Sequence, residues 1–269
     1  MSLERLDKVL CHHGFGSRKD VKKLCHRQLV FLNGNIVTDS AQRVDVERDR
    51  IEIYGEEIRL QKDIYVMMNK CMNTVCANKD GEHSTVFDLL DDSVKHKFLG
   101  GDIHCMGRLD IDTEGLLILT TDGQLTHRLL SPKTHIPKQY AVGLEKKLSS
   151  QEKQLYIKTF AEGFWIDREQ NESGFQCQSS YLEFLKDDEG LPLENFQSGK
   201  VDCYLTIFEG KFHQVKRMFA QMGNKVIYLK RIKMGNLKLD SSIPLGQWKE
   251  LSEEELSLLK EPPSALHSI

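Results

Sequence analysis

The N-terminal part of the chain alternates between helical and extended spacing of its apolar positions. Apolar side chains recur every three to four positions in residues 5–13, which predicts a helix. Ser17 predicts the start of a second helix, because Asp20 completes a capping box with it. Residues 29–32 form an apolar run that leads to an Asn-Gly pair, the pattern of a strand entering a hairpin turn. The pattern predicts a small module of two helices and a hairpin.

The longer remainder of the chain predicts a second, larger domain. Apolar runs predict strands at residues 64–68, 116–119, 138–142, 181–185, 201–208 and 226–229. Helical spacing and capping signals predict helices at residues 85–90, 94–99, 124–130, 149–161 and 215–222, and from residue 251 onward. The polar stretch 56–63 is interpreted as a linker. We therefore expect domains at residues 1–60 and 61–260, followed by a frayed tail at 261–269.

Composition narrows the function classes. A chain of 269 residues with 39% hydrophobic and 29% charged residues is typical of a soluble globular protein. No apolar run approaches the roughly 18 residues of a membrane span, and the first residues are polar and lack a secretory signal. The seven cysteines are scattered and form no Cys-x-x-Cys pair, which indicates reduced thiols and no zinc site. We expect a cytoplasmic monomer that needs no metal.

The distribution of charge points to a polyanionic partner, although the net charge of -3 does not. Residues 1–30 contain seven Lys or Arg and three Asp or Glu, and residues 211–233 contain seven Lys or Arg and no acid. Because the rest of the chain is acidic, the two basic segments are expected to form separate surfaces. A protein that meets nucleic acid on defined faces has this charge pattern. Two solvated helix faces are the alternative.

A polar loop between Gly107 and Gly115 is the strongest candidate for a reacting group. The loop contains two carboxylates, Asp110 and Asp112, and leads into the apolar run of residues 116–119. Loops that a rigid strand positions often carry catalytic residues. An aspartate that only caps a turn has the same local pattern, so these residues alone leave both interpretations open.

The same loop resembles the signature of pseudouridine synthases. The similarity covers Gly107-Arg108-Leu109-Asp110, then Thr113, Gly115 and an apolar run that ends at Asp122-Gly123. It is greatest to the RsuA branch, whose members modify small-subunit ribosomal RNA. This resemblance implies that Asp110 is the catalytic nucleophile. The adjacent Arg108 can reach a phosphate and help to hold the base out of its stack.

Two further motifs support the resemblance. The segment His213-Gln214-Val215-Lys216-Arg217-Met218 is similar to a second family signature, in which a basic residue pairs with the catalytic aspartate. We expect Lys216 to be that partner, with Arg217 as the second choice. Tyr140 lies in a Lys-x-Tyr-x-Val pattern whose tyrosine, in the family, packs on the target base; a stacked base contributes about 1–3 kcal/mol. Arg231 lies in a Leu-x-Arg pattern that the family shares, and we expect it to bind RNA.

One stretch departs from the family pattern. Residues 69–73 have Cys71 where the family usually has proline and Asn73 where it has glycine. Both replacements are expected to weaken a rigid turn, because proline fixes the backbone and glycine tolerates conformations that other residues avoid.

The N-terminal module resembles the S4 RNA-binding fold of ribosomal proteins. The similarity consists of Arg-Leu-Asp-Lys at residues 5–8, Ser-Arg at 17–18 and Val-x-x-Asn-Gly at 30–34. A basic helix with a capped N-terminus suits duplex phosphates and contributes affinity rather than sequence information. The RNA-binding residues expected in this module are Arg5, Lys8, Arg18, Lys19, Lys22 and Lys23.

Together, the resemblances imply an α+β protein. An S4-type domain would precede a catalytic domain with a mixed, mainly antiparallel sheet flanked by helices. The implied reaction is the isomerisation of a uridine to pseudouridine in small-subunit (16S) ribosomal RNA, free or in a partly assembled small subunit. It needs no cofactor. The carboxylate of Asp110 has to be ionised, and a nearby cation stabilises that form.

Three alternatives remain open. A 23S ribosomal RNA synthase of the same family would carry the same motifs. A non-catalytic S4-type RNA-binding protein would explain the basic segments but not the Asp110 loop. A hydrolytic nucleosidase would need a second acid or a metal to activate water, and Asp112 is the nearby candidate. The residues do not identify the target uridine.

Overall fold

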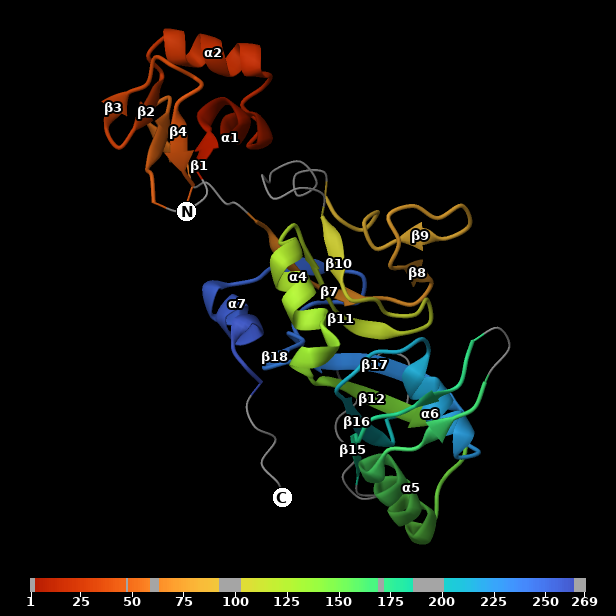
Figure 1. Ribbon diagram of the computed structural model, residues 1–269. Helices are drawn as coiled ribbons and strands as arrows, with labels where there is room; N and C mark the ends of the chain where they lie inside the picture. The colour runs from red at the N-terminus through yellow and green to blue at the C-terminus, as the bar shows by residue number, and fades with distance from the viewer. Residues whose placement is uncertain are drawn as a thin grey trace. The chain divides into compact units, whose positions relative to one another are not determined.

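Figure 1 shows a computed structural model of the chain, which describes residues 3–46, 48–58, 63–91, 103–168, 172–185 and 201–263. These residues form two compact units. The first takes in Met1–Tyr65, Leu90–His104 and Leu119–Gly123, and the second takes in Val66–Leu89, Cys105–Ile118 and Gln124–Ile269. The helix predicted at residues 94–99 and the end of the predicted tail lie outside the described residues.

The first unit contains the predicted module of two helices and a hairpin. Its elements are β1 (Leu3–Arg5), α1 (Leu6–His12), α2 (Arg18–His26), β2 (Val30–Leu32), β3 (Asn35–Ile36), β4 (Arg43–Asp45), β5 (Ile51–Ile53) and β6 (Glu56–Ile58). Helix α2 begins at the predicted capping box, in which Ser17 and Asp20 bond each other's main-chain N–H groups. Its apolar face is buried with the core of this unit.

The hairpin turn also forms as predicted. Asn33 and Gly34 have φ values of 50° and 80°, so both central residues are left-handed, as the favoured two-residue hairpin turn requires. The interpretation of residues 56–63 as a linker is wrong at its start. Tyr54 and Gly55 form a second left-handed turn, which returns Glu56–Ile58 to β5 as the paired strand β6.

A mixed sheet organises the second unit. Its strands follow one another in the order β15, β16, β12, β17, β11, β7 and β19, with β10 beside β11 and β18 beside β17. The bounds are β7 (Tyr65–Lys70), β10 (His104–Met106), β11 (Glu114–Thr120), β12 (Lys138–Leu144), β15 (Tyr181–Phe184), β16 (Cys203–Ile207), β17 (Val226–Met234), β18 (Leu237–Lys238) and β19 (Trp248–Glu250). Strands β11 and β17 are parallel, whereas β12 is antiparallel to both of its neighbours. This confirms the predicted α+β fold class.

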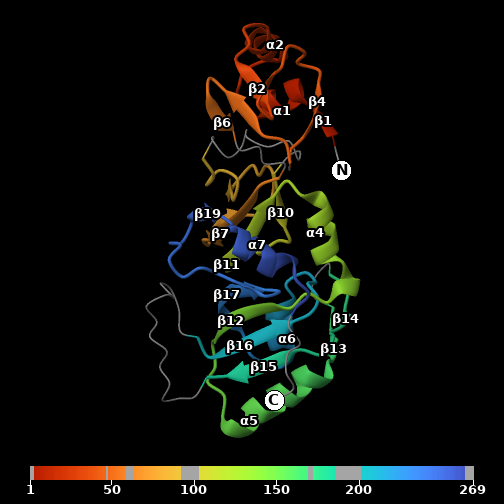
Figure 2. The same ribbon diagram turned by 90° about the vertical axis from the view of Figure 1, so that its left-hand side faces the viewer.

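Helices and short strands surround this sheet. They are β8 (Thr74–Val75), β9 (Ser84–Thr85), α4 (Gly123–Leu130), the 3-10 turn η1 (Pro132–Thr134), α5 (Ser150–Glu162), β13 (Trp165–Ile166), β14 (Phe175–Gln176), α6 (Gln214–Gln221) and α7 (Glu253–Lys260). Figure 2 shows α5 beside the β15 edge of the sheet. No helix among the described residues is long and apolar enough to cross a membrane.

One predicted helix does not form. Residues 86–89 are in turns, and β9 ends at Thr85. The Asp88 carboxylate accepts hydrogen bonds from both the N–H and the hydroxyl of Thr85, at 2.7 and 2.9 Å. Together with the bond from the Asp88 N–H to the Thr85 hydroxyl, these are the bonds of a capping box, but only turns follow it, so the helical prediction for residues 85–90 was wrong.

Gly115 allows the two central parallel strands to meet. It lies in β11 with a φ of 100°, opposite Arg231 of β17. A Cβ atom at this position would lie 2.3 Å from the main-chain oxygen of Arg231 and 2.7 Å from Cγ of Lys230. Any side chain at position 115 therefore has to push β11 and β17 apart.

We expect Gly115→Ala to lower the free energy of unfolding of the second unit by at least about 2 kcal/mol, from backbone strain together with the steric clash. Gly81→Ala is the matched control, because a Cβ there meets nothing within 4 Å and the residue belongs to the same unit. Both tryptophans, Trp165 and Trp248, belong to the second unit, so their fluorescence during urea unfolding reports on it. Equal stability of the two variants would contradict the close-approach argument.

Candidate active site

The candidate catalytic loop connects β10 to β11. Gly107 begins it with a φ of 78°, and Leu109 anchors it with only 6% of its surface exposed. The main-chain N–H of Thr113 donates to the Asp110 carbonyl at 3.1 Å, which closes the loop into a turn. The Asp110 side chain is 28% exposed. The loop therefore holds this carboxylate at the surface on a backbone that is fixed from both ends.

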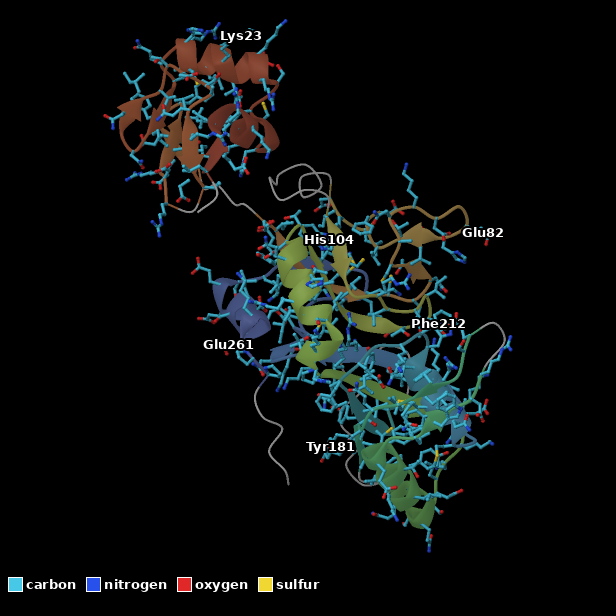
Figure 3. The ribbon with its side chains drawn as sticks, in the orientation of Figure 1. Lys23, Glu82, His104, Tyr181, Phe212 and Glu261 are labelled. Carbon is cyan, nitrogen blue, oxygen red and sulfur yellow. The ribbon has the colours of Figure 1, made fainter. Side chains whose placement is uncertain are left out.

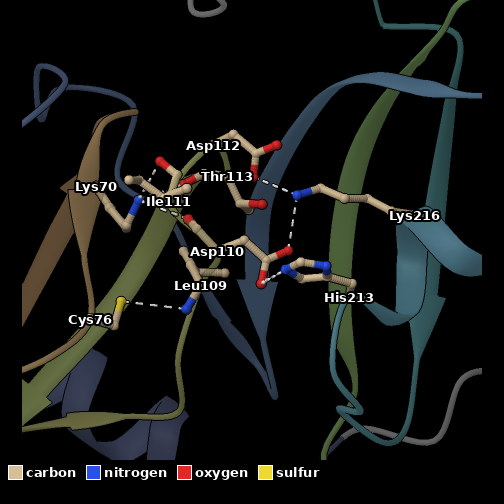
Figure 4. A network of polar contacts seen from close by, with 9 residues as sticks. All are labelled: Lys70, Cys76, Leu109, Asp110, Ile111, Asp112, Thr113, His213 and Lys216. Atoms are coloured by element: carbon tan, nitrogen blue, oxygen red, sulfur yellow. Dashed lines mark hydrogen bonds and ion pairs between the residues drawn. The ribbon is translucent and has the colours of Figure 1, made fainter. Parts of the chain in front are cut away.

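Lys70 supports the loop by bonding to its main chain (Figure 4). It ends strand β7 and is fully buried, and its Nζ donates to the main-chain carbonyls of Asp110 at 3.0 Å and Thr113 at 2.9 Å. It also reaches the carbonyls of Cys71 at 3.1 Å and Ile111 at 3.4 Å. Burial lowers the pKa of this ammonium, against the opposing effect of the nearby thiol and carboxyl groups. A charged donor to several carbonyls fixes their orientation, since each such hydrogen bond contributes about 1.5–3 kcal/mol.

Sequence reasoning missed Lys70. The available signal was a lysine directly after an apolar run, where a continuing strand keeps it inside the protein. The departure from the family at Asn73 proves structurally mild: Asn73 adopts the left-handed conformation, with a φ of 62°. Asparagine tolerates that region better than most residues. Its N–H donates to the Ile111 carbonyl at 2.9 Å, which ties the turn to the catalytic loop.

Two thiols, those of Cys76 and Cys105, lie close to the loop. The main-chain N–H of Leu109 donates to Sγ of Cys76 at 3.4 Å. A hydrogen bond from Cys105 lowers the pKa of Cys76, with help from Leu109 and from the charges of Lys70 and Arg231 and in spite of burial. Among the described residues, no group of His, Cys, Asp and Glu side chains is arranged to hold a metal ion.

Helix α6 brings two cationic or polar groups to Asp110. Nζ of Lys216 lies 3.1 Å from Oδ2 of Asp110 and also pairs with Asp112. Nε2 of His213 lies 3.7 Å from Oδ1 of Asp110 (Figure 4). Burial acts to raise the pKa of Asp112, but the hydrogen bond and charge of Lys216 outweigh it, so the net shift is downward. The two sequence motifs thus meet in space, although more than a hundred residues separate them.

Arg217, the second choice for this partner, points elsewhere. Successive residues of a helix lie about 100° apart around its axis, so Lys216 and Arg217 face different surroundings. Arg217 is 4% exposed, and its Nη2 donates to the main-chain carbonyls of Asp167 at 2.9 Å and Ser173 at 3.0 Å. Its guanidinium carbon also lies 4.7 Å from the centroid of the Phe175 ring. Through these contacts it stabilises the chain around β13 and β14.

Tyr140 and Arg231 lie in one row of the sheet with Gly115. Tyr140 of β12 pairs in register with Arg231 of β17, which pairs with Gly115 of β11. Tyr140 is 8% exposed. Arg231 is 2% exposed, and its Nε donates to the Leu116 carbonyl at 2.7 Å. Its Nη2 is buried without a hydrogen-bond partner among the described residues.

The predicted basic surface of residues 211–233 therefore needs correction. Arg217, Lys230 and Arg231 are buried, so these three charges serve the interior of the fold. The expectation that Arg231 contacts RNA from the surface does not agree with its position. Sequence spacing gives the number of charges in a segment, but both faces of β17 are covered at Lys230 and Arg231, so neither of these adjacent residues reaches solvent.

The N-terminal module does present a basic helix face. Arg18, Lys19 and Lys22 of α2 are exposed, and the exposed Lys23 pairs with Asp20 at 3.0 Å (Figure 3). The other two predicted RNA-binding residues have carboxylate partners within the module. Arg5 pairs with Asp7 at 2.6 Å and Lys8 pairs with Glu4 at 3.0 Å. In the catalytic loop, Arg108 is exposed.

The fold and the site together define an RNA-modifying enzyme with an appended RNA-binding module, and comparisons with known proteins agree. A family model for RNA pseudouridylate synthases matches residues 64–221, and an S4 domain model matches residues 4–51. The uncharacterized RNA pseudouridine synthase YtzG of Bacillus subtilis is 41% identical over 258 residues, covering 96% of this chain and 99% of that protein. Ribosomal small subunit pseudouridine synthase A of Pasteurella multocida is 35% identical, covering 94% and 98% of the two chains.

A crystal structure of a pseudouridylate synthase matches with a TM-score of 0.59 and 34% sequence identity, covering 95% of this chain and 99% of the other. The chain therefore belongs to the RNA pseudouridylate synthase family, and it carries an S4 domain at its N-terminus. Its activity is that of a pseudouridine synthase.

We expect Lys70→Met to destabilise the second unit by about 2–4 kcal/mol, because buried carbonyls of the catalytic loop would lose their donor. Activity should fall together with stability, since the same carbonyls position Asp110. Lys79→Met is the matched control, because Lys79 is exposed in the same unit. Urea unfolding followed by tryptophan fluorescence measures the difference. A Lys70→Met variant as stable and active as Lys79→Met would show that the buried lysine does not support the loop.

Proposed function

We propose that this protein isomerises one uridine of small-subunit (16S) ribosomal RNA to pseudouridine, with Asp110 as the nucleophile. The observation that supports Asp110 is its contact with Lys216 and His213, which come from the second family motif. The relative from Pasteurella multocida is named ribosomal small subunit pseudouridine synthase A, which supports the choice of RNA. The substrate would be free ribosomal RNA or a partly assembled small subunit.

The reaction rearranges bonds without changing oxidation state. The bond between ribose carbon 1 and the base nitrogen breaks, the uracil turns, and carbon 5 of the base bonds to the sugar and loses its proton, while the released nitrogen gains one. Asp110 takes part as an ionised carboxylate, and the Lys216 ammonium at 3.1 Å balances its negative charge. The uridine has to leave its stack before this carboxylate can reach it.

Three other side chains have supporting roles in this proposal. Tyr140, in the sheet row next to Arg231, offers an aromatic face for the extruded uracil. Arg108 is exposed beside Asp110 and can bind a phosphate of the distorted strand. Arg231 acts from the interior, where its Nε holds the Leu116 carbonyl at the start of the sheet row.

The N-terminal module contributes affinity for RNA. We propose residues 1–60 as the RNA-binding domain and residues 61–260 as the catalytic domain. The exposed basic residues of α2 bind phosphates of a duplex and set the register of the substrate. The protein acts in the cytoplasm, as a monomer, where ribosomal RNA is made and assembled.

A hydrolytic nucleosidase is less consistent with the site. It would need Asp112 to activate water, but Lys216 pairs with this carboxylate and the net shift of its pKa is downward. A carboxylate with a lowered pKa is a weak general base. Asp112 is instead a second ion-pair partner of Lys216.

Mapping pseudouridine by carbodiimide treatment and primer extension tests the proposed function. Ribosomal RNA from cells that lack this protein should miss one pseudouridine of the small subunit, and the unsubstituted protein should restore it. Asp110→Asn should not restore it, because an amide is a poor nucleophile, although it should still bind RNA. Glu82→Gln makes the same charge change at an exposed residue of the same unit and should restore the modification.

Different outcomes remove different parts of the proposal. A missing pseudouridine in the large subunit would move the substrate to 23S ribosomal RNA. Full restoration by Asp110→Asn would remove the nucleophile assignment. Release of free uracil from the RNA would favour hydrolysis.

A further inference from the structure

An exposed aromatic ring lies directly beside the group that touches Asp110. Phe212 has 50% of its surface exposed beside this charged site. Its ring stacks on the imidazole of His213, with ring centroids 3.8 Å apart and planes 22° apart. Because one face of the phenyl ring is covered by His213, the exposed surface lies on its edges and its opposite face.

The backbone holds this pair of rings in a fixed place. His213 is left-handed, with a φ of 49°, and it caps helix α6. The main-chain N–H of Lys211 donates to Oε1 of Gln214 at 3.0 Å, and the N–H of Gln214 donates to the Lys211 carbonyl at 3.2 Å. Gln214 is itself buried and donates to Glu209 at 2.7 Å. A left-handed residue other than glycine costs free energy, and such strain clusters at sites of function.

The stacked rings of Phe212 and His213 lie close to the Asp110 carboxylate. His213 connects the two, since its Nε2 lies 3.7 Å from Asp110 and its ring lies against Phe212. Lys216 adds a positive charge one helical turn further on. An aromatic face beside a cation is what single-stranded nucleic acid binds, because bases stack on the ring and phosphates meet the charge. Figure 3 shows Phe212 at the surface of the second unit.

An exposed aromatic face of this kind can assist the extrusion of a uridine. When one nucleotide leaves a stack, its neighbour loses a stacking partner, and that loss is part of the cost of extrusion. We propose that the Phe212 ring, supported by His213, is a stacking site for the nucleobase next to the target uridine. This inference rests on the proposed function, because it assumes that RNA enters the Asp110 site. Stacking there offsets part of the extrusion cost.

A fluorescence experiment tests the inference without requiring turnover. The probe is an RNA hairpin containing the mapped uridine, with 2-aminopurine on either its 5′ or its 3′ side, bound to full-length protein carrying Asp110→Asn. Stacking on Phe212 should alter the 2-aminopurine fluorescence at one of the two positions. Adding Phe212→Ala should remove that change, whereas Phe212→Trp should keep it. Tyr181→Ala is the matched control, because Tyr181 is 48% exposed on the edge strand β15 of the same unit.

A kinetic experiment gives the size of the effect. In protein with Asp110 intact, Phe212→Ala should lower kcat/KM about 5- to 150-fold, the equivalent of the roughly 1–3 kcal/mol of one stacked base. An abasic nucleotide at the neighbouring position should make the Phe212→Ala and unsubstituted proteins equal, because neither can then stack. Tyr181→Ala should keep the unsubstituted kcat/KM with both RNAs.

The failure of this inference is distinguishable from that of the proposed function. If the unsubstituted protein forms pseudouridine but Phe212→Ala changes neither the fluorescence nor kcat/KM, the stacking site is refuted and the function stands. If the purified unsubstituted protein forms no pseudouridine in this hairpin, the function fails, and the fluorescence still decides whether Phe212 stacks on a base. An equal loss with intact and abasic RNA would show a structural role for Phe212 and would also overturn the inference.

Discussion

Two lysines from different parts of the chain hold the Asp110 loop, and the site depends on both. Lys70 acts through the main chain, where its buried ammonium donates to the carbonyls of Asp110 and Thr113. Lys216 acts through side chains, where it pairs with Asp110 and Asp112. One lysine fixes the backbone and the other balances the charge. A carboxylate held in this way suits the proposed role of Asp110 as the nucleophile.

The sheet makes this arrangement possible. Strand β11 carries the loop at its start, and β17 approaches it so closely that only glycine fits at position 115. The same row of the sheet contains Tyr140 and Arg231, so the residues that would face the base and those that support the loop share one rigid layer. Helix α6 precedes β17 and brings Lys216 and His213 to the same loop.

Local signals in the sequence predicted much of this fold. The capping boxes that begin α2 and α5 are complete within four residues, so they could be recognised directly. The pairing of Lys216 with Asp110 could be expected from a family motif, because nothing local joins residues so far apart. Side-chain direction was the main source of error. Arg217 and Arg231 look like surface charges in the sequence but are buried, and Lys70 was missed because its role depends on a loop forty residues away.

The central claim is that the Lys216 ammonium holds the Asp110 carboxylate in place and balances its charge. The single-turnover rate of pseudouridine formation by Lys216→Met tests this claim. Removal of one charged partner from a reacting site commonly lowers a rate about 100- to 1,000-fold, and we expect a loss of this size at saturating RNA. Lys225→Met, which removes an exposed charge in the same basic segment, should keep the unsubstituted rate. A Lys216→Met protein that is folded and reacts as fast as Lys225→Met would contradict the account.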